Sequence, residues 1–111
     1  MIKKFILFLL IYNTGFLSFS NVRDELKADE DVKHYEDYIK LAQSSMESNN
    51  ELAFDYAHNA YELAVLLNDK AKIAESNMLI GDVFCQNHSY PTAIKYYEDA
   101  IKALNDLNDH I

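Results

Sequence analysis

Cys85 and His88 are the residues whose types and spacing come closest to a chemical site. A cysteine thiolate and a histidine imidazole can both bind Zn²⁺, and His58 or Asp82 could supply further ligands. A structural zinc site needs four ligands, and this pair offers only two. We therefore favour the alternative that Cys85 is an ordinary helix position and His88 a turn residue. We expect no metal and no cofactor, with a small metal or thiol protein as the lesser alternative.

No other set of residues predicts catalysis. The sequence contains no glycine-rich phosphate-binding loop, no nucleophile elbow and no paired metal-binding motif. Cys85 is the only cysteine, so an internal disulfide cannot form and the fold must be held by packing. We expect a protein that binds other molecules and does not act as an enzyme.

The first twenty residues predict a secretory signal peptide. Lys3 and Lys4 give it a charged start, and the apolar run Phe5–Tyr12 follows. Ser18 and Ser20 then offer small side chains at the two positions that a signal peptidase inspects, so we place the cleavage after Ser20. The apolar run is too short to span a bilayer, which needs about 20 residues. We expect an exported protein, periplasmic or secreted, with an uncleaved membrane anchor as the alternative.

Charge narrows the class of partner. The whole chain carries a formal net charge of −8, and removal of residues 1–20 with their two lysines changes it to 8 − 18 = −10. Such a balance argues against binding of nucleic acid and of an anionic membrane surface. It favours a basic or neutral partner, although acidic residues that merely solvate helix faces would give the same composition.

Helix is the regular structure that the sequence predicts. The whole chain has only two glycines and one proline, and its apolar residues recur at the three-and-four spacing of a helix face. An all-α fold of antiparallel helices is therefore expected. The predicted helices run, in chain order, from about 24 or 29 to 47, then over 52–67, 70–86 and 90–107. Residues 21–31 hold few apolar side chains, so a disordered lead is the alternative there.

Polar residues mark the predicted helix boundaries. A capping box that starts at Ser48 opens the second helix, with Asn49 and Asn50 as competing caps. Asn68 tolerates the left-handed conformation that ends a helix, and Asp69 can cap the next one. These tight connections predict antiparallel neighbours.

The sequence matches itself at an offset of forty positions. Residues 53–69 align with residues 93–109, and six of the aligned pairs are identical. The apolar spacing agrees at most of the other positions. A period of this length is typical of helical repeat proteins, whose function is binding.

The last two predicted helices resemble a tetratricopeptide repeat. The resemblance is carried by small, aromatic and alanine residues at that family's spacing, namely Gly81, Phe84, Tyr90, Ala93, Tyr97 and Ala100. Packing explains these types, because small residues let two helices cross closely while aromatic rings fill the space around the crossing. Residues 70–109 are thus expected to form one repeat.

An earlier and degenerate copy is expected over residues 32–69. Ala53 and Ala60 match the alanine positions, and Ala57 stands where the family has an aromatic residue. The resemblance implies two helix-turn-helix units stacked as a fragment of a right-handed α-solenoid. The forty-residue spacing is also that of a subtype that resembles the sensor regions of bacterial signalling proteins, which is an analogy of fold.

The resemblance also implies a concave groove lined by the leading helix of each repeat. It assigns to this groove Glu75, Leu79, Asp82, Cys85 and Gln86 from the third predicted helix, with Tyr35, Tyr38, Ile39, Ala42 and Ser45 of the first predicted helix as looser equivalents. Tyrosines, aliphatic side chains and two carboxylates suit an extended or helical peptide that has apolar anchors and a basic group. The same apolar residues could instead belong to the core.

The outer face of the last helix is expected to be open. A further repeat would cover the side chains beyond Ala100 and Leu104, and repeat arrays generally need about three repeats and a polar cap. One interpretation is an exported interaction module without catalysis, which binds a protein or peptide and forms a homodimer through this helix. The alternative is the truncated sensor region of a bacterial signalling protein, of the histidine kinase or transcription regulator type, that lacks its effector domain.

Overall fold

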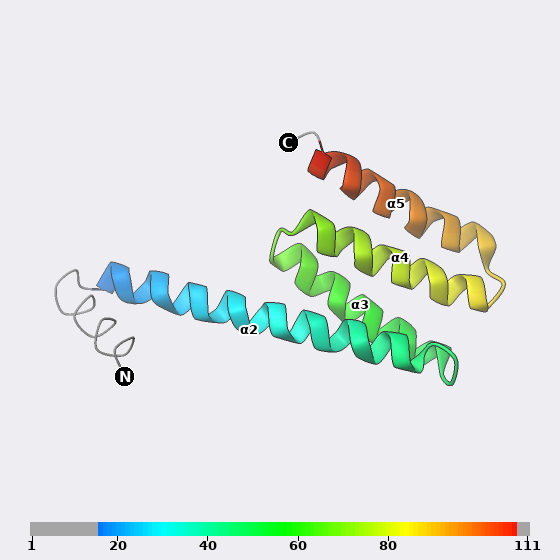
Figure 1. Cartoon of the computed structure of the whole chain (residues 1–111), viewed down its shortest axis with the longest axis horizontal. Coiled ribbons are helices and arrows are strands. Elements are labelled where there is room, and N and C mark those ends of the chain that lie inside the picture. The colour runs from blue at the N-terminus through cyan, green and yellow to red at the C-terminus, as the bar shows by residue number, and fades with distance from the viewer. Residues whose placement is uncertain (1–15, 109–111) are drawn as a thin grey trace. The chain divides into compact units, whose positions relative to one another are not determined.

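The chain is all-helical over residues 16–108, the part that the computed structural model describes; side chains are described for residues 22–108. Four helices follow one another, labelled α2 (Phe16–Ser45), α3 (Asn50–Leu66), α4 (Lys70–Gln86) and α5 (Tyr90–Asn108) (Figure 1). The predicted all-α fold class is therefore confirmed. The apolar run Phe5–Tyr12 and most of the predicted signal peptide lie outside the described residues.

Residues 1–31 and residues 32–111 form two separate compact units. The described part of the first unit is the beginning of α2, and its side chains from Arg23 to Glu30 are all exposed. Helix, rather than a disordered lead, occupies residues 21–31, and it begins at Phe16 instead of the predicted 24 or 29. No glycine or proline interrupts residues 16–45, so nothing in the backbone chemistry stops the helix there.

Helix boundaries in the second unit follow the predicted polar residues closely. The predicted bounds of α4 are confirmed at both ends, and those of α3 and α5 differ by two residues at most. Asp69 caps α4 as predicted, because its side chain accepts a hydrogen bond from the backbone nitrogen of Lys72 at 3.1 Å. The capping box at Ser48 is wrong. Asn49 caps α3 instead: its extended backbone lets its side chain accept a hydrogen bond from Leu52 N at 3.0 Å.

Two residues with a left-handed backbone end α3 and α4. Asn68 has φ = 52°, as predicted, and His88 has φ = 61°. In each turn the next backbone N–H bonds to the carbonyl five residues earlier, at 3.2 Å after Asn68 and 2.9 Å after His88. This is the Schellman arrangement, which satisfies carbonyls that a helix end leaves without partners. Helices α3, α4 and α5 accordingly begin at positions 50, 70 and 90, twenty residues apart.

The core of the second unit joins α2, α3 and α4. Its fully buried side chains come from all three helices: Tyr35, Ile39, Ala42, Ala57, Ala60, Ala64, Leu79 and Ile80. Many of these are alanines, which let the helix backbones approach closely. Helix α4 lies between α3 and α5 (Figure 1). Its Phe84 links the two neighbours, with an edge contact to Phe54 at 5.7 Å and a stacked contact to Tyr96 at 5.5 Å.

Candidate functional site

The small and aromatic residues that were assigned to packing lie on α3, α4 and α5. Ala53 and Ala60 on α3 and Ala93 and Ala100 on α5 are buried, and Phe84 on α4 is half-buried. Gly81 lies directly under the ring of Tyr97, where an added Cβ atom would come within 2.6 Å of Tyr97 Cε1. Close approach therefore requires glycine at this position.

Tyr90 departs from its expected packing role. Its side chain is 53% exposed, and its hydroxyl lies 3.0 Å from His88 Nδ1. The reason is its position as the first residue of α5, where the side chain extends past the end of α4 into solvent. The Tyr90 side chain thus contacts the turn residue His88 and is not part of the core.

A line of open hollows runs between α2 and α4. Three neighbouring hollows, with volumes of about 310, 320 and 560 Å³, share the side chain of Gln43 at their centre. We call this line the α2–α4 groove. Six of the ten predicted groove residues line it, namely Tyr35, Ile39, Glu75, Leu79, Asp82 and Gln86. Ala42, Ser45 and Cys85 do not line it.

The six residues divide into a floor and a rim. Tyr35, Ile39 and Leu79 are buried in the core, so they form the floor and offer little surface of their own. Glu75, Asp82 and Gln86 are exposed and form part of the rim. The alternative that the apolar groove residues belong to the core is therefore correct for those three.

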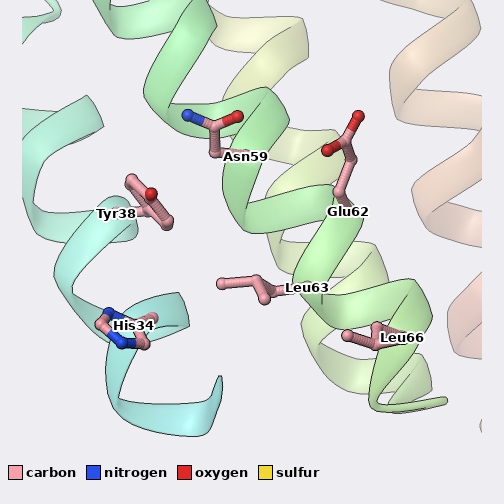
Figure 2. Close-up of a pocket in the computed structure, with 6 residues that line it drawn as sticks. All are labelled: His34, Tyr38, Asn59, Glu62, Leu63 and Leu66. Atoms are coloured by element: carbon pink, nitrogen blue, oxygen red, sulfur yellow. The ribbon is translucent and has the colours of Figure 1, made fainter. Parts of the chain in front are cut away.

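Tyr38 lies elsewhere. It lines a separate hollow of about 440 Å³ between α2 and α3, together with His34, Asn59, Glu62, Leu63 and Leu66 (Figure 2). Its ring centroid is 6.2 Å from that of Tyr56 on α3. Successive residues lie about 100° apart around a helix, so Tyr38 points toward α3 while the adjacent Ile39 lines the groove.

The hydroxyl of Tyr35 ties the floor of the groove to its rim. It donates a hydrogen bond to Glu75 Oε1 at 2.5 Å and lies 3.1 Å from the carbonyl oxygen of Lys72. Burial raises the pKa of Tyr35 far above its ordinary value, and the adjacent Glu75 carboxylate raises it further. The Lys72 ammonium lies 5.3 Å from the centroid of the same ring. Tyr35 is thus a neutral donor that fixes the position of Glu75.

Tyr97 holds the second rim carboxylate in the same way. Its hydroxyl donates to Asp82 Oδ1 at 2.5 Å and lies 3.4 Å from Cys85 Sγ. The hydrogen bond to Asp82 raises the pKa of Tyr97 well above its ordinary value, with Cys85 and burial adding to the rise. Cys85 is therefore half-buried beside a phenol, and His88 contacts Tyr90. Residues 22–108 contain no group of three or more side chains arranged to bind a metal ion.

Carboxylates dominate the rim of the groove. Its lining includes the four acidic residues Glu36, Glu47, Glu75 and Asp82 and the two basic residues Lys40 and Lys72. Lys72 already lies 3.4 Å from Asp69 Oδ2, so part of the positive charge is compensated outside the groove. Gln43, Glu36 and Glu47 line the groove although none of them was predicted there. Gln43 follows Ile39 by four residues, and this helical spacing is the signal that would have placed it there.

Comparisons of the sequence with protein-family profiles, with characterised proteins and with solved structures found no match. Within the described part of the chain, no helix combines the length and the hydrophobicity that a membrane span requires.

Proposed function

We propose that this protein is an interaction module whose α2–α4 groove binds a peptide segment that carries apolar anchors and basic groups. The observation that supports the proposal most directly is the excess of carboxylates around an apolar floor. Met46 and Met78 supply apolar surface in the same hollows. Such a combination recognises a segment by burial of its apolar side chains and by charge-assisted hydrogen bonds to its lysines or arginines.

Two of the carboxylates are already positioned for this task. Glu75 and Asp82 each accept one hydrogen bond from a tyrosine hydroxyl. A carboxylate has about four acceptor positions, so each can still accept further donors from a bound cation. The tyrosines hold the two carboxylates in place before a ligand arrives. Binding would therefore cost less conformational entropy of the Glu75 and Asp82 side chains.

A repeat organisation of the tetratricopeptide type is part of the proposal. Its support is that α3, α4 and α5 begin twenty residues apart, so that two helices make up the forty-residue offset at which the sequence matches itself. In that organisation α2 and α4 are equivalent leading helices. The groove between them would then be the concave surface on which such arrays bind their partners.

We propose further that the protein is exported, with residues 1–20 as its signal peptide. Cleavage after Ser20 would fall within α2 and leave residues 21–45 of that helix. The intact mass of the protein recovered from a secreting host tests the site. A mass that corresponds to a first residue Asn21 supports export, and a chain that begins at Met1 contradicts it.

The groove is tested by selection of ligands from a random peptide library displayed on phage, against the full chain. The most enriched sequence is then synthesised and titrated against two matched variants. Gln43→Arg adds a bulky cation at the centre of the groove, and Asn59→Arg adds the same side chain in the hollow of Figure 2.

We expect the enriched peptides to combine basic and apolar residues. Gln43→Arg should lower the affinity for the synthetic peptide by about tenfold or more. The arginine is larger than glutamine and repels the basic residues of the peptide. Asn59→Arg should leave the affinity unchanged. Enriched peptides without basic residues, or a peptide that loses affinity only in Asn59→Arg, would contradict the proposal.

A further inference from the structure

Helix α5 carries an exposed stripe of large apolar side chains. Ile94 is 53% exposed, Ile101 58% and Leu104 40%, and the half-buried Tyr97 lies between them. The four positions are spaced by three, four and three residues, which places them along one face of the helix. We call them the α5 stripe. Ile94, Ile101 and Leu104 are left exposed by the described helices, and the ring of Tyr97 packs on Gly81 of α4.

The same positions on α3 are covered. At the forty-residue offset, the α5 stripe corresponds to Phe54, Ala57, Tyr61 and Ala64. Ala57 and Ala64 are fully buried, and the two aromatic side chains pack against the same cluster, which includes Leu79 and Ile80 of α4. A face that is covered in the first half of the repeat pattern is therefore open in the second half, where its residues remain large and apolar.

We infer that a second copy of this chain covers the α5 stripe, with the two α5 helices antiparallel. The spacing of three, four and three is the same in both directions, so Ile94 faces Leu104 of the second copy and Tyr97 faces Ile101. Each side chain then meets an apolar partner, and the contact is self-complementary about a twofold axis, as in most homodimers. This inference goes beyond the proposed function, because it concerns a face of α5, of which only Leu104 also lines the α2–α4 groove.

Charges beside the stripe favour a second copy as its occupant. Lys95, Glu98 and Lys102 lie along one edge of the stripe. In the antiparallel pair this row meets itself in reverse order, and the two Glu98 carboxylates lie between the four lysines of both chains. The row carries a net charge of +1 in a chain whose total is −8, so two copies approach here without the repulsion that the rest of the surface exerts.

Size predicts a weak dimer. With 19 residues, α5 is about 28 Å long. A contact along one such helix lies at or below the lower end of the size range of stable interfaces, about 1,200 Å². We therefore expect a dissociation constant on the order of micromolar, so that dimer and monomer both occur at accessible concentrations.

Sedimentation equilibrium of the full chain over a range of concentrations tests the inference. Ile101→Lys introduces a charge in the middle of the stripe, and Leu66→Lys makes the same kind of change at a 67% exposed residue of α3. Glu98→Lys removes the central negative charge of the row, and adding Lys102→Glu in that background restores the net charge of +1 that the row has in the wild type. Helical circular dichroism on the same samples checks that each variant folds.

We expect a monomer–dimer equilibrium for the wild type and for Leu66→Lys. Ile101→Lys and Glu98→Lys should weaken the dimer by about tenfold or more, and the double variant should recover most of the loss. A wild type that stays monomeric throughout would overturn the inference and leave the stripe to a helix of another protein. Equal association of Ile101→Lys and Leu66→Lys would overturn it as well.

The two proposals fail separately. A monomeric wild type that still binds the selected peptide removes the dimer alone. A dimer that is sensitive to Ile101→Lys but binds no peptide removes the groove alone.

Discussion

Gly81 leaves space for the ring of Tyr97 and for no side chain of its own. An added Cβ would lie 2.6 Å from Cε1, 2.8 Å from Cδ1 and 3.0 Å from Cζ of that ring. The ring cannot move freely, because its hydroxyl is bonded to Asp82. Overpacking of this kind costs about 1–3 kcal/mol, whereas alanine is favoured over glycine inside a helix by about 1 kcal/mol.

We predict that Gly81→Ala lowers the free energy of unfolding by about 1 kcal/mol. In a Tyr97→Ala background the same change should raise it by about 1 kcal/mol, because only the helix preference remains. Urea denaturation of the four chains of this cycle measures both values. If Gly81→Ala changes the free energy of unfolding with the same sign in both backgrounds, the close contact with the Tyr97 ring is not the reason for glycine at position 81.

Tyr35 is the second residue whose role is decided by one contact. It is 2% exposed, and its hydroxyl bonds to Glu75 and to the carbonyl of Lys72. Tyr35→Phe should lower the free energy of unfolding at pH 7 by about 1–2 kcal/mol, because Glu75 loses its donor.

The pH dependence gives a separate test of Tyr35. Its pKa is raised in the folded protein, so its contribution to stability is complete below the unfolded-state pKa of about 10 and is lost as the pH rises beyond that value. The wild type should therefore lose stability between pH 9 and pH 11, as an estimate of about one unit on either side of that pKa. Tyr35→Phe should lose less over the same range. Urea denaturation at several pH values in this range measures the free energy of unfolding of both chains. If that free energy falls equally with pH in both, Tyr35 does not have a raised pKa in the folded protein.

Helix ends show how far the sequence determined the elements. Asp69 and Asn68 were assigned correctly, since each side chain or backbone preference acts within its own turn. Ser48 and Asn49 were adjacent candidates with similar capping ability. Asn49 is the cap because its backbone is extended, with φ = −155° and ψ = 93°, and residue type alone does not decide which of two adjacent candidates adopts that conformation.

Asn49→Ala is predicted to lower the free energy of unfolding by about 1 kcal/mol, because the N–H of Leu52 loses its acceptor. Ser48→Ala should change it by less than about 0.5 kcal/mol, as is usual for a surface substitution. Thermal or urea denaturation of both variants measures the difference. A larger loss of stability in Ser48→Ala than in Asn49→Ala would instead identify Ser48 as the cap of α3.

His88 occupies a backbone conformation that costs most residues about 1 kcal/mol and glycine almost nothing. His88→Gly should therefore raise the free energy of unfolding by roughly 0.5–1 kcal/mol, the range known for relief of such strain. Asn68→Gly should give a smaller gain, because asparagine tolerates this conformation better. A loss of stability in His88→Gly would mean that the contact between its ring and Tyr90 outweighs the backbone strain.

At the scale of the whole molecule, the sequence predicted the all-helical fold and most of the groove lining. The hollows between α2 and α4 bring together Tyr35, Ile39, Glu75, Leu79 and Asp82, which the resemblance had implied for a groove. Exposure could not be predicted in the same way. Three of these side chains form the floor because α2 packs directly on α4, and Tyr38 turns toward α3 because it lies on the other side of that contact.

The stripe on α5 illustrates the same limit. Ile101 and Leu104 fit the pattern of a buried helix face, yet both are exposed. Helical spacing identifies an apolar face but not the element that covers it. The fold thus presents two surfaces with different chemistry, an acidic groove over an apolar floor and an apolar stripe beside a row of lysines.

Mapping of the selected peptide on the ¹⁵N-labelled full chain by NMR tests the central claim most directly. We predict that the backbone amide signals of Gln43, Glu75 and Asp82 shift as the peptide is added, because these residues line the α2–α4 groove. Those of Asn59 and Leu66, in the hollow of Figure 2, should stay in place. Shifts confined to Asn59 and Leu66, or to the α5 stripe, would contradict the groove as the binding site.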